Sequence, residues 1–126
     1  MNFEEALRHE LMMITGLEER VFPLTATEGT EPPFIVFGSS NGKKIQTLTG
    51  FSAVGEVTAE IHLVTENYDT LKLMQTAVIA KLSTFQGRSI GIDGPFIKSF
   101  TYDEPEEAHD NELGYERASF DIRVRF

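Results

Sequence analysis

Side chains that could do chemistry gather in an acidic run near the carboxyl end of the sequence. Its candidate ligands are Asp103, Glu104, Glu106, Glu107, His109, Asp110 and Glu112. Such groups bind hard cations, but a calcium loop spaces them around a tight glycine turn, and this run lacks that spacing. Runs of like charge usually face water. The sequence therefore favours a solvated hairpin loop over a metal site.

The three histidines give no sign of catalysis. His9, His62 and His109 fall on three different predicted elements, and none has a serine or carboxylate at a spacing typical of a catalytic set. No glycine-rich segment opens a predicted helix, so no phosphate-binding loop is expected. The chain has no cysteine, which excludes thiol chemistry, disulfides and cysteine-based zinc sites. We expect no catalytic, cofactor or metal site.

Positive charge and apolar atoms meet in residues 39–50, SSNGKKIQTLTG. Asn41-Gly42 is a strong turn signal, and we expect a long polar connection between two antiparallel strands. Connections of this length in small domains are usually functional or disordered. A plain surface loop and a partner contact are both open. For a contact, the candidate assembly-interface residues are Asn41, Gly42, Lys43, Lys44, Ile45, Gln46, Thr47 and Leu48.

The stretch that must organise the chain is 54–87, where a strand pattern changes into a helix pattern. In the strand half, one face is apolar at a period of two: Val57, Ala59, Ile61 and Leu63. In the helix half, apolar residues recur three or four apart: Leu71, Met74, Val78, Leu82 and Phe85, with Leu73 and Ala77 widening the stripe. Between an Asn67 N-cap and Gly87, this predicts a helix of about 19 residues that covers the sheet.

The other elements follow from the same two periods. Residues 2–15 predict a first helix with the apolar stripe Phe3, Leu7, Leu11 and Ile14, flanked by Ala6 and Met13. We expect strands at 21–22, at 34–37 in a central or doubly covered position, at 90–92 turning through Asp93-Gly94 to 96–102, and at 117–126, with an acidic loop at 103–114. This order predicts one α+β domain over 1–126, with a mostly antiparallel or mixed sheet and two helices packed on one face.

Composition limits the possible partners and location. The chain of 126 residues is long enough for one domain with its own core. It shows neither a signal-peptide pattern nor an apolar stretch of bilayer length, so we expect a soluble protein of a reducing cytoplasm. A formal net charge of −9 disfavours nonspecific binding to nucleic acid or anionic membranes.

Four segments, in this order, carry a resemblance to a known family: Val21-Phe22-Pro23, Pro32-Pro33-Phe34-Ile35-Val36, Ile61 to Val64, and Tyr68-Asp69. Over roughly residues 1–90, the chain resembles the tail-completion, or tail-to-head-joining, family of long-tailed bacteriophages and prophages, which is related in fold to phage tail terminators. The resemblance implies a ring, typically hexameric, at the head-proximal end of the tail tube. It also implies tail-tube and head-connector proteins as partners, assembly in the bacterial cytoplasm, and no catalytic residues.

Two other function classes compete with this one. A small acidic inhibitor or immunity-type protein would mimic nucleic acid, but Arg117, Arg123 and Arg125 interrupt the acidic surface that a mimic needs. An enzyme with a site between protomers would need a nucleophile, a base and a cofactor motif, and the sequence indicates none of these. For a tail protein, we expect residues 39–50 to be mobile in the free protomer and to become ordered when Lys43 and Lys44 meet an acidic surface on the next copy.

Overall fold

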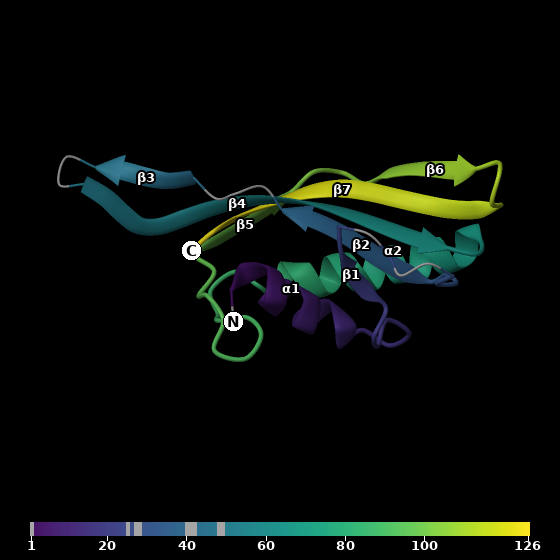
Figure 1. The fold of residues 1–126 in the computed structure, drawn as a ribbon, viewed down its shortest axis with the longest axis horizontal. Coiled ribbons are helices and arrows are strands. Elements are labelled where there is room, and N and C mark those ends of the chain that lie inside the picture. The colour runs from purple at the N-terminus through teal and green to yellow at the C-terminus, as the bar shows by residue number, and fades with distance from the viewer. Residues whose placement is uncertain (1, 25, 27–28, 40–42, 48–49) are drawn as a thin grey trace.

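One β-sheet carries both helices on a single face (Figure 1). The computed structural model describes residues 2–24, 26, 29–39, 43–47 and 50–126, with the backbone alone for 43–47 and 50–55. This arrangement confirms the α+β class predicted from the sequence. The elements are α1 (Phe3–Met12), β1 (Val21–Pro23), β2 (Phe34–Ser39), β3 (Lys43–Thr47), β4 (Gly50–Thr65), α2 (Tyr68–Ser83), β5 (Ser99–Tyr102), β6 (Glu106–Asp110) and β7 (Tyr115–Arg125).

The sheet is organised around β4, its longest strand. The hydrogen-bonded path runs β1-β2-β4-β7-β5, while β3 pairs with β4 and β6 pairs with β7. Only β1 and β2 are parallel among these strand pairs, so the sheet is mixed. Glu56 of β4 is paired with both Lys43 and Arg125, so β3 and β7 lie on opposite edges of β4.

The core lies between the sheet and the two helices. On β4 the predicted alternation is confirmed, and its apolar face is buried: Val57, Ala59, Ile61 and Leu63. The register Ile61↔Phe120 aligns this face with the buried side chains of β7. Each large apolar side chain buried here stabilises the fold by roughly 1.5–3 kcal/mol before entropy is counted. The helices supply buried side chains from the opposite side of the core: Phe3, Ala6, Leu7 and Leu11 from α1, and Leu71, Val78 and Leu82 from α2.

Each helix is capped at its N-terminus by the side chain of an asparagine. The Asn67 Oδ1 atom accepts a hydrogen bond of 2.8 Å from the backbone N–H of Thr70, as the predicted N-cap requires, and Asn2 does the same for Glu5. The α2 helix has 16 residues instead of about 19, because the Thr84 N–H and hydroxyl both bond the Lys81 carbonyl and tighten the last turn.

For two residues of the predicted apolar stripes, the expected burial is wrong. Leu73 is 75% exposed and Met13 is 60% exposed. The α2 helix packs against the sheet along only one face, and Leu73 lies off that face. Met13 follows the last residue of α1, where the chain turns away. On β2, Ile35 and Phe37 are buried but the alternate residues are half-buried, because the helices cover only one side of the sheet.

The predicted hairpin at 90–102 differs in its pairing. A single bridge, Ser89↔Phe96, joins its two sides, and β5 pairs with β7 instead. The Phe100 ring packs edge-on against Phe85, just after α2, with ring centroids 6.2 Å apart, so contact with the buried Phe85 favours placing this segment in the main sheet.

Two predicted loops are partly strands. Within 103–114, residues Glu106–Asp110 form β6 and pair with the start of β7. Within 39–50, residues Lys43–Thr47 form β3, which pairs with β4 from Lys43↔Glu56 to Thr47↔Gly50. Asn41, Gly42 and Leu48 lie outside the described residues. Along the part of the chain that the structure covers, no helix is long and apolar enough to cross a membrane.

Candidate functional site

The clearest candidate site is a two-stranded extension of the sheet, which we call the arm: residues 43–47 and 50–55. Beyond Glu56, strand β4 pairs only with β3 among the described residues, because β7 ends at Arg125 and β2 pairs no further than Ala59. The arm projects past the helices and past every other strand (Figure 1). Six extended residues of β4 span about 20 Å, so the extension is long for a molecule of this size.

The arm lacks the support that orders the rest of the sheet. A two-stranded hairpin by itself is at best marginally stable in water, and its free edges can pair with another chain. In the described chain, no third strand pairs with β3 or with residues 50–55 of β4. Five of the predicted interface residues, Lys43 to Thr47, form β3. The structure therefore places them on a strand that, among the described residues, is paired on one edge only.

A second candidate surface is the acidic run, which the sequence indicated as a solvated loop. Arg123 makes two hydrogen bonds to Asp103, of 3.0 and 3.2 Å, and this contact raises the pKa of Arg123. Lys72 donates a hydrogen bond of 2.8 Å to Glu107, and its pKa is raised as well. These partners offset part of the charge of the run, so its central residues can form strand β6.

Three carboxylates of this run remain without a basic partner. Among the described side chains, none forms an ion pair with Glu104, Glu106 or Glu112. Glu104 and Glu106 border a hollow of about 180 Å³ on the uncovered sheet face, together with Glu60 and Asp121. Within the described part of the chain, no group of three His, Asp or Glu side chains is placed to hold a metal ion. The free carboxylates are thus available to a basic partner.

A shallow groove of about 460 Å³ also opens on the uncovered face of the sheet. Its floor includes Phe34, Val36 and Val64, and its rims include Leu24 and Leu113, which are 81% and 65% exposed. Exposed apolar surface of this kind marks protein contacts more often than chemistry. Sequence patterning placed Leu113 in the acidic loop at 103–114 and gave no sign that it shares a groove with Leu24.

Two of the histidines have carboxylate neighbours that sequence spacing did not indicate. The His62 Nε2 atom lies 2.9 Å from Glu60, and the His109 Nδ1 atom lies 2.6 Å from Glu116. Each pair lies on strands at the protein surface, and each histidine adds a local positive charge when protonated. These contacts are surface pairs, which typically contribute little to stability.

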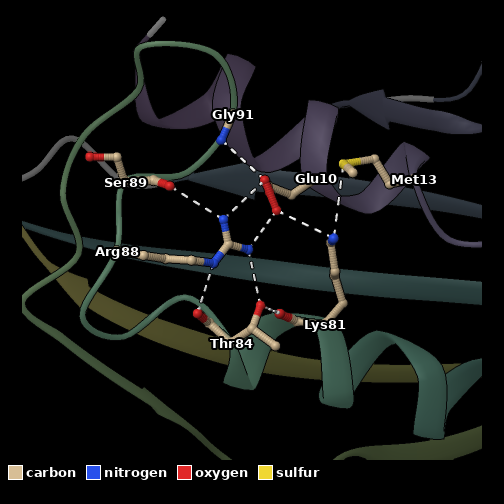
Figure 2. A network of polar contacts seen from close by, with 7 residues as sticks. All are labelled: Glu10, Met13, Lys81, Thr84, Arg88, Ser89 and Gly91. Carbon is tan, nitrogen blue, oxygen red and sulfur yellow. Dashed lines mark hydrogen bonds and ion pairs between the residues drawn. The ribbon is translucent and has the colours of Figure 1, made fainter.

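Sequence reasoning missed one buried polar network, centred on Glu10 of α1 (Figure 2). Its carboxylate accepts hydrogen bonds from Arg88 at 2.6 Å and from the Gly91 N–H at 3.1 Å, and the Lys81 amine lies 3.5 Å away. Burial would raise the pKa of Glu10, but the bonds from Arg88 and Gly91 and the charge of Lys81 outweigh it, so the pKa lies below its usual value. The network ties α1 to α2 and to the loop after it.

A signal for this network was present in the sequence. Glu10 lies four residues after Ala6 and seven after Phe3, so it falls on the apolar stripe of α1, and it is 4% exposed. A charged residue on such a stripe indicates a buried, paired group.

Comparisons with known proteins assign the chain to a family. None of the curated proteins compared with the chain matches it. A solved chain described as "Virion of native gene transfer agent (GTA) particle" is similar with a TM-score of 0.68 and 15% identity, over 98% of this chain and 92% of that one. Another solved chain gives a TM-score of 0.55 and 11% identity, over 98% and 91%. These two likenesses show the fold.

The family match covers almost the whole sequence. Residues 6–126 match the family described as Tail completion protein gp17. The match includes the arm, β6 and the Glu10 network, and it extends beyond the stretch on which the resemblance in sequence rests. The chain therefore belongs to the Tail completion protein gp17 family of structural phage tail proteins.

Proposed function

We propose that this protein completes the phage tail as a ring of identical copies and joins the tail tube to the head connector. The observation that carries the proposal is the arm, a paired but uncovered extension in a member of a tail-completion family. The arm extends from one end of the molecule, so a contact with another copy would join two different surfaces. Contacts of this heterologous type close into rings when the rotation between copies allows it.

Charge supports assembly on a tail rather than in free solution. Each copy carries a formal net charge of −9, so a ring of six gathers six such charges in a small volume. This self-repulsion opposes association of free protomers, particularly at low ionic strength. Once the tail and connector hold the copies together, specific contacts between oppositely charged surfaces can outweigh it.

The nucleic-acid mimic is the weaker candidate. A mimic needs carboxylates spread without interruption over one face, but Arg123 is held against Asp103 and Arg117 lies 3.8 Å from Asp110, so both arginines interrupt the acidic run. These guanidinium groups would face the same basic partner as the carboxylates and repel it.

The test is a replacement of residues 43–55 by a short Gly-Ser linker, in a phage or prophage whose own copy of the gene is deleted. We expect this variant to fold but to yield tails that do not join heads, as counted by electron microscopy. The matched control, Leu73→Ser with Ala80→Ser, changes exposed positions of α2 and should give normal particles. Normal head joining by the arm replacement would contradict the role of the arm, and normal particles from the gene deletion would contradict the proposed function.

A further inference from the structure

We infer that the outer edge of β6, which begins at Glu106 and follows Glu104, is the receptor for strand β3 in the arm of a second copy. This inference deepens the proposed ring and rests on it. The contact would add one strand to an existing sheet edge and bring the positive charge of the arm close to free carboxylates.

The positions of the two elements fit a contact between copies. In Figure 1 the arm extends at one end of the longest axis of the molecule, and β6 lies toward the other end. The arm of one copy therefore cannot reach β6 of the same copy. Because the donor and the receptor are different surfaces, the same contact can repeat from copy to copy around a ring.

Both strands have a free edge of the same length. Strand β6 pairs with β7 through Glu106↔Ser119 to Asp110↔Tyr115, and within the described residues no strand pairs with its other edge. Strand β3 is likewise paired on one edge, with β4. Each strand has five residues, so the backbone groups of one could be matched along the whole length of the other.

The charges of the two elements are opposite and locally concentrated. From residue 39 to residue 55 the only charged residues are Lys43 and Lys44, although the whole chain is strongly acidic. Residues 103–112 contain six carboxylates and neither Lys nor Arg. Within the copy, Arg123, Lys72 and Arg117 offset part of this charge, but Glu104 and Glu106 stay unpaired in the described structure. An arm from another copy supplies the missing cations.

Disulfide trapping tests this contact directly, because the chain has no cysteine of its own. The double variant Lys44→Cys/Glu106→Cys should form a ladder of linked copies under mild oxidation, and the ladder should grow with protein concentration and weaken with salt. Trapping captures brief encounters, so it does not depend on a stable ring in solution. The matched control Lys44→Cys/Glu5→Cys places the second thiol at an exposed site on α1, away from β6, and should give only background linkage.

Charge reversal is an independent test of the same contact. Glu104→Lys/Glu106→Lys should weaken association by about tenfold or more, and mixing it with Lys43→Glu/Lys44→Glu should restore association because the charges are exchanged. Glu31→Lys/Glu66→Lys makes the same net change at exposed sites and should have a smaller effect. Denaturation curves of each variant show that the fold is intact.

The outcomes separate this contact from the proposed function. Absence of the Lys44–Glu106 ladder at millimolar protein, or charge-reversed proteins that associate like the wild type, would overturn the contact. If the wild type still forms rings, the ring proposal stands and another surface closes it. If the ladder forms but heads and tails join without the protein, the contact stands and the proposed function fails.

Discussion

Strand β4 passes through two environments, and the difference between them explains what each part of the molecule is for. From residue 57 to 65 it is paired with β7, and from 59 to 64 also with β2, and it buries every second side chain under the helices. From 50 to 55 its only strand partner in the part of the chain that the structure describes is β3, and no helix lies over it in Figure 1. Packing and strand pairing therefore stabilise one end of this strand much more than the other.

This contrast separates two kinds of stabilisation. In the body, apolar burial offsets the entropy of ordering the chain, which costs roughly 1–2 kcal/mol for the backbone of each residue. In the arm, strand pairing alone must offset this entropy, and an isolated pair of strands is at best marginally stable in water. A protein can use such an extension only if something outside the protomer completes its packing. The body is the scaffold, and the arm is the part that we assign to assembly.

The largest expected effect is in hydrogen exchange along β4 of the free protein. Amides of residues 57–64 should exchange only through global unfolding, and those of 50–55 through local opening, a difference of about 5 kcal/mol or more in opening free energy. Exchange measured by NMR or mass spectrometry at low protein concentration checks this. Equal protection of the two segments in the monomer would remove the distinction between body and arm.

The next largest effect is expected in the core of the body. Leu82 on α2 is 1% exposed, and Leu82→Ala should lower the free energy of unfolding by about 2–5 kcal/mol, the range for removing a buried leucine. Chemical denaturation should show one cooperative transition for both proteins. The exposed Leu73→Ala is the matched control and should cost far less. A loss below about 1 kcal/mol for Leu82→Ala would show that this helix face is not packed.

A smaller, pH-dependent effect is expected for Glu10→Gln. The change removes charged hydrogen bonds and should cost about 1–3 kcal/mol near pH 7, toward the lower end because the Arg88 side chain is 37% exposed and screened by water. The pKa of Glu10 is lower in the folded protein than its ordinary 4.5, so this stability is full above that value and is lost as pH falls through the folded pKa. Denaturation curves of both proteins from pH 7 to pH 3 measure it.

A matched variant keeps this pH prediction specific. Glu66→Gln alters an exposed carboxylate and should leave the same pH dependence as the wild type. If Glu10→Gln lost no more stability than Glu66→Gln at pH 7, the network in Figure 2 would not contribute to stability.

The smallest effect on stability is expected for the arm itself. Replacing residues 43–55 by a short Gly-Ser linker should change the free energy of unfolding of the body by less than about 0.5 kcal/mol, since the arm pairs only with itself beyond Glu56. Denaturation of the variant beside the wild type measures this. A loss above about 2 kcal/mol would mean that the arm is part of the core.

Local patterns in the sequence were enough to predict the main elements. The change from period two to period 3.6 across 54–87 placed β4 and α2, and alternation placed β7, because burial on one face imposes these periods on a chain whatever its neighbours are. Asn67 was recognisable as an N-cap because capping is a bond within one turn of a helix. The candidate interface residues were proposed in the same way, from charge and composition alone, and they stay a prediction.

Features that depend on distant residues were beyond these patterns. Residues 106–110 and 43–47 form strands because of partners in other segments of the chain. Strand β6 pairs with β7, which also supplies arginines, and β3 pairs with the end of β4 that extends beyond β7. Glu10 was visible as a misplaced charge, but Arg88 and Gly91 are joined to it only by the packing of α1 against the end of α2. The sequence determined which faces must be buried and which charges exist. The tertiary structure decided which edges stay open and which charges stay unpaired, because both are set by contacts between segments far apart in the chain.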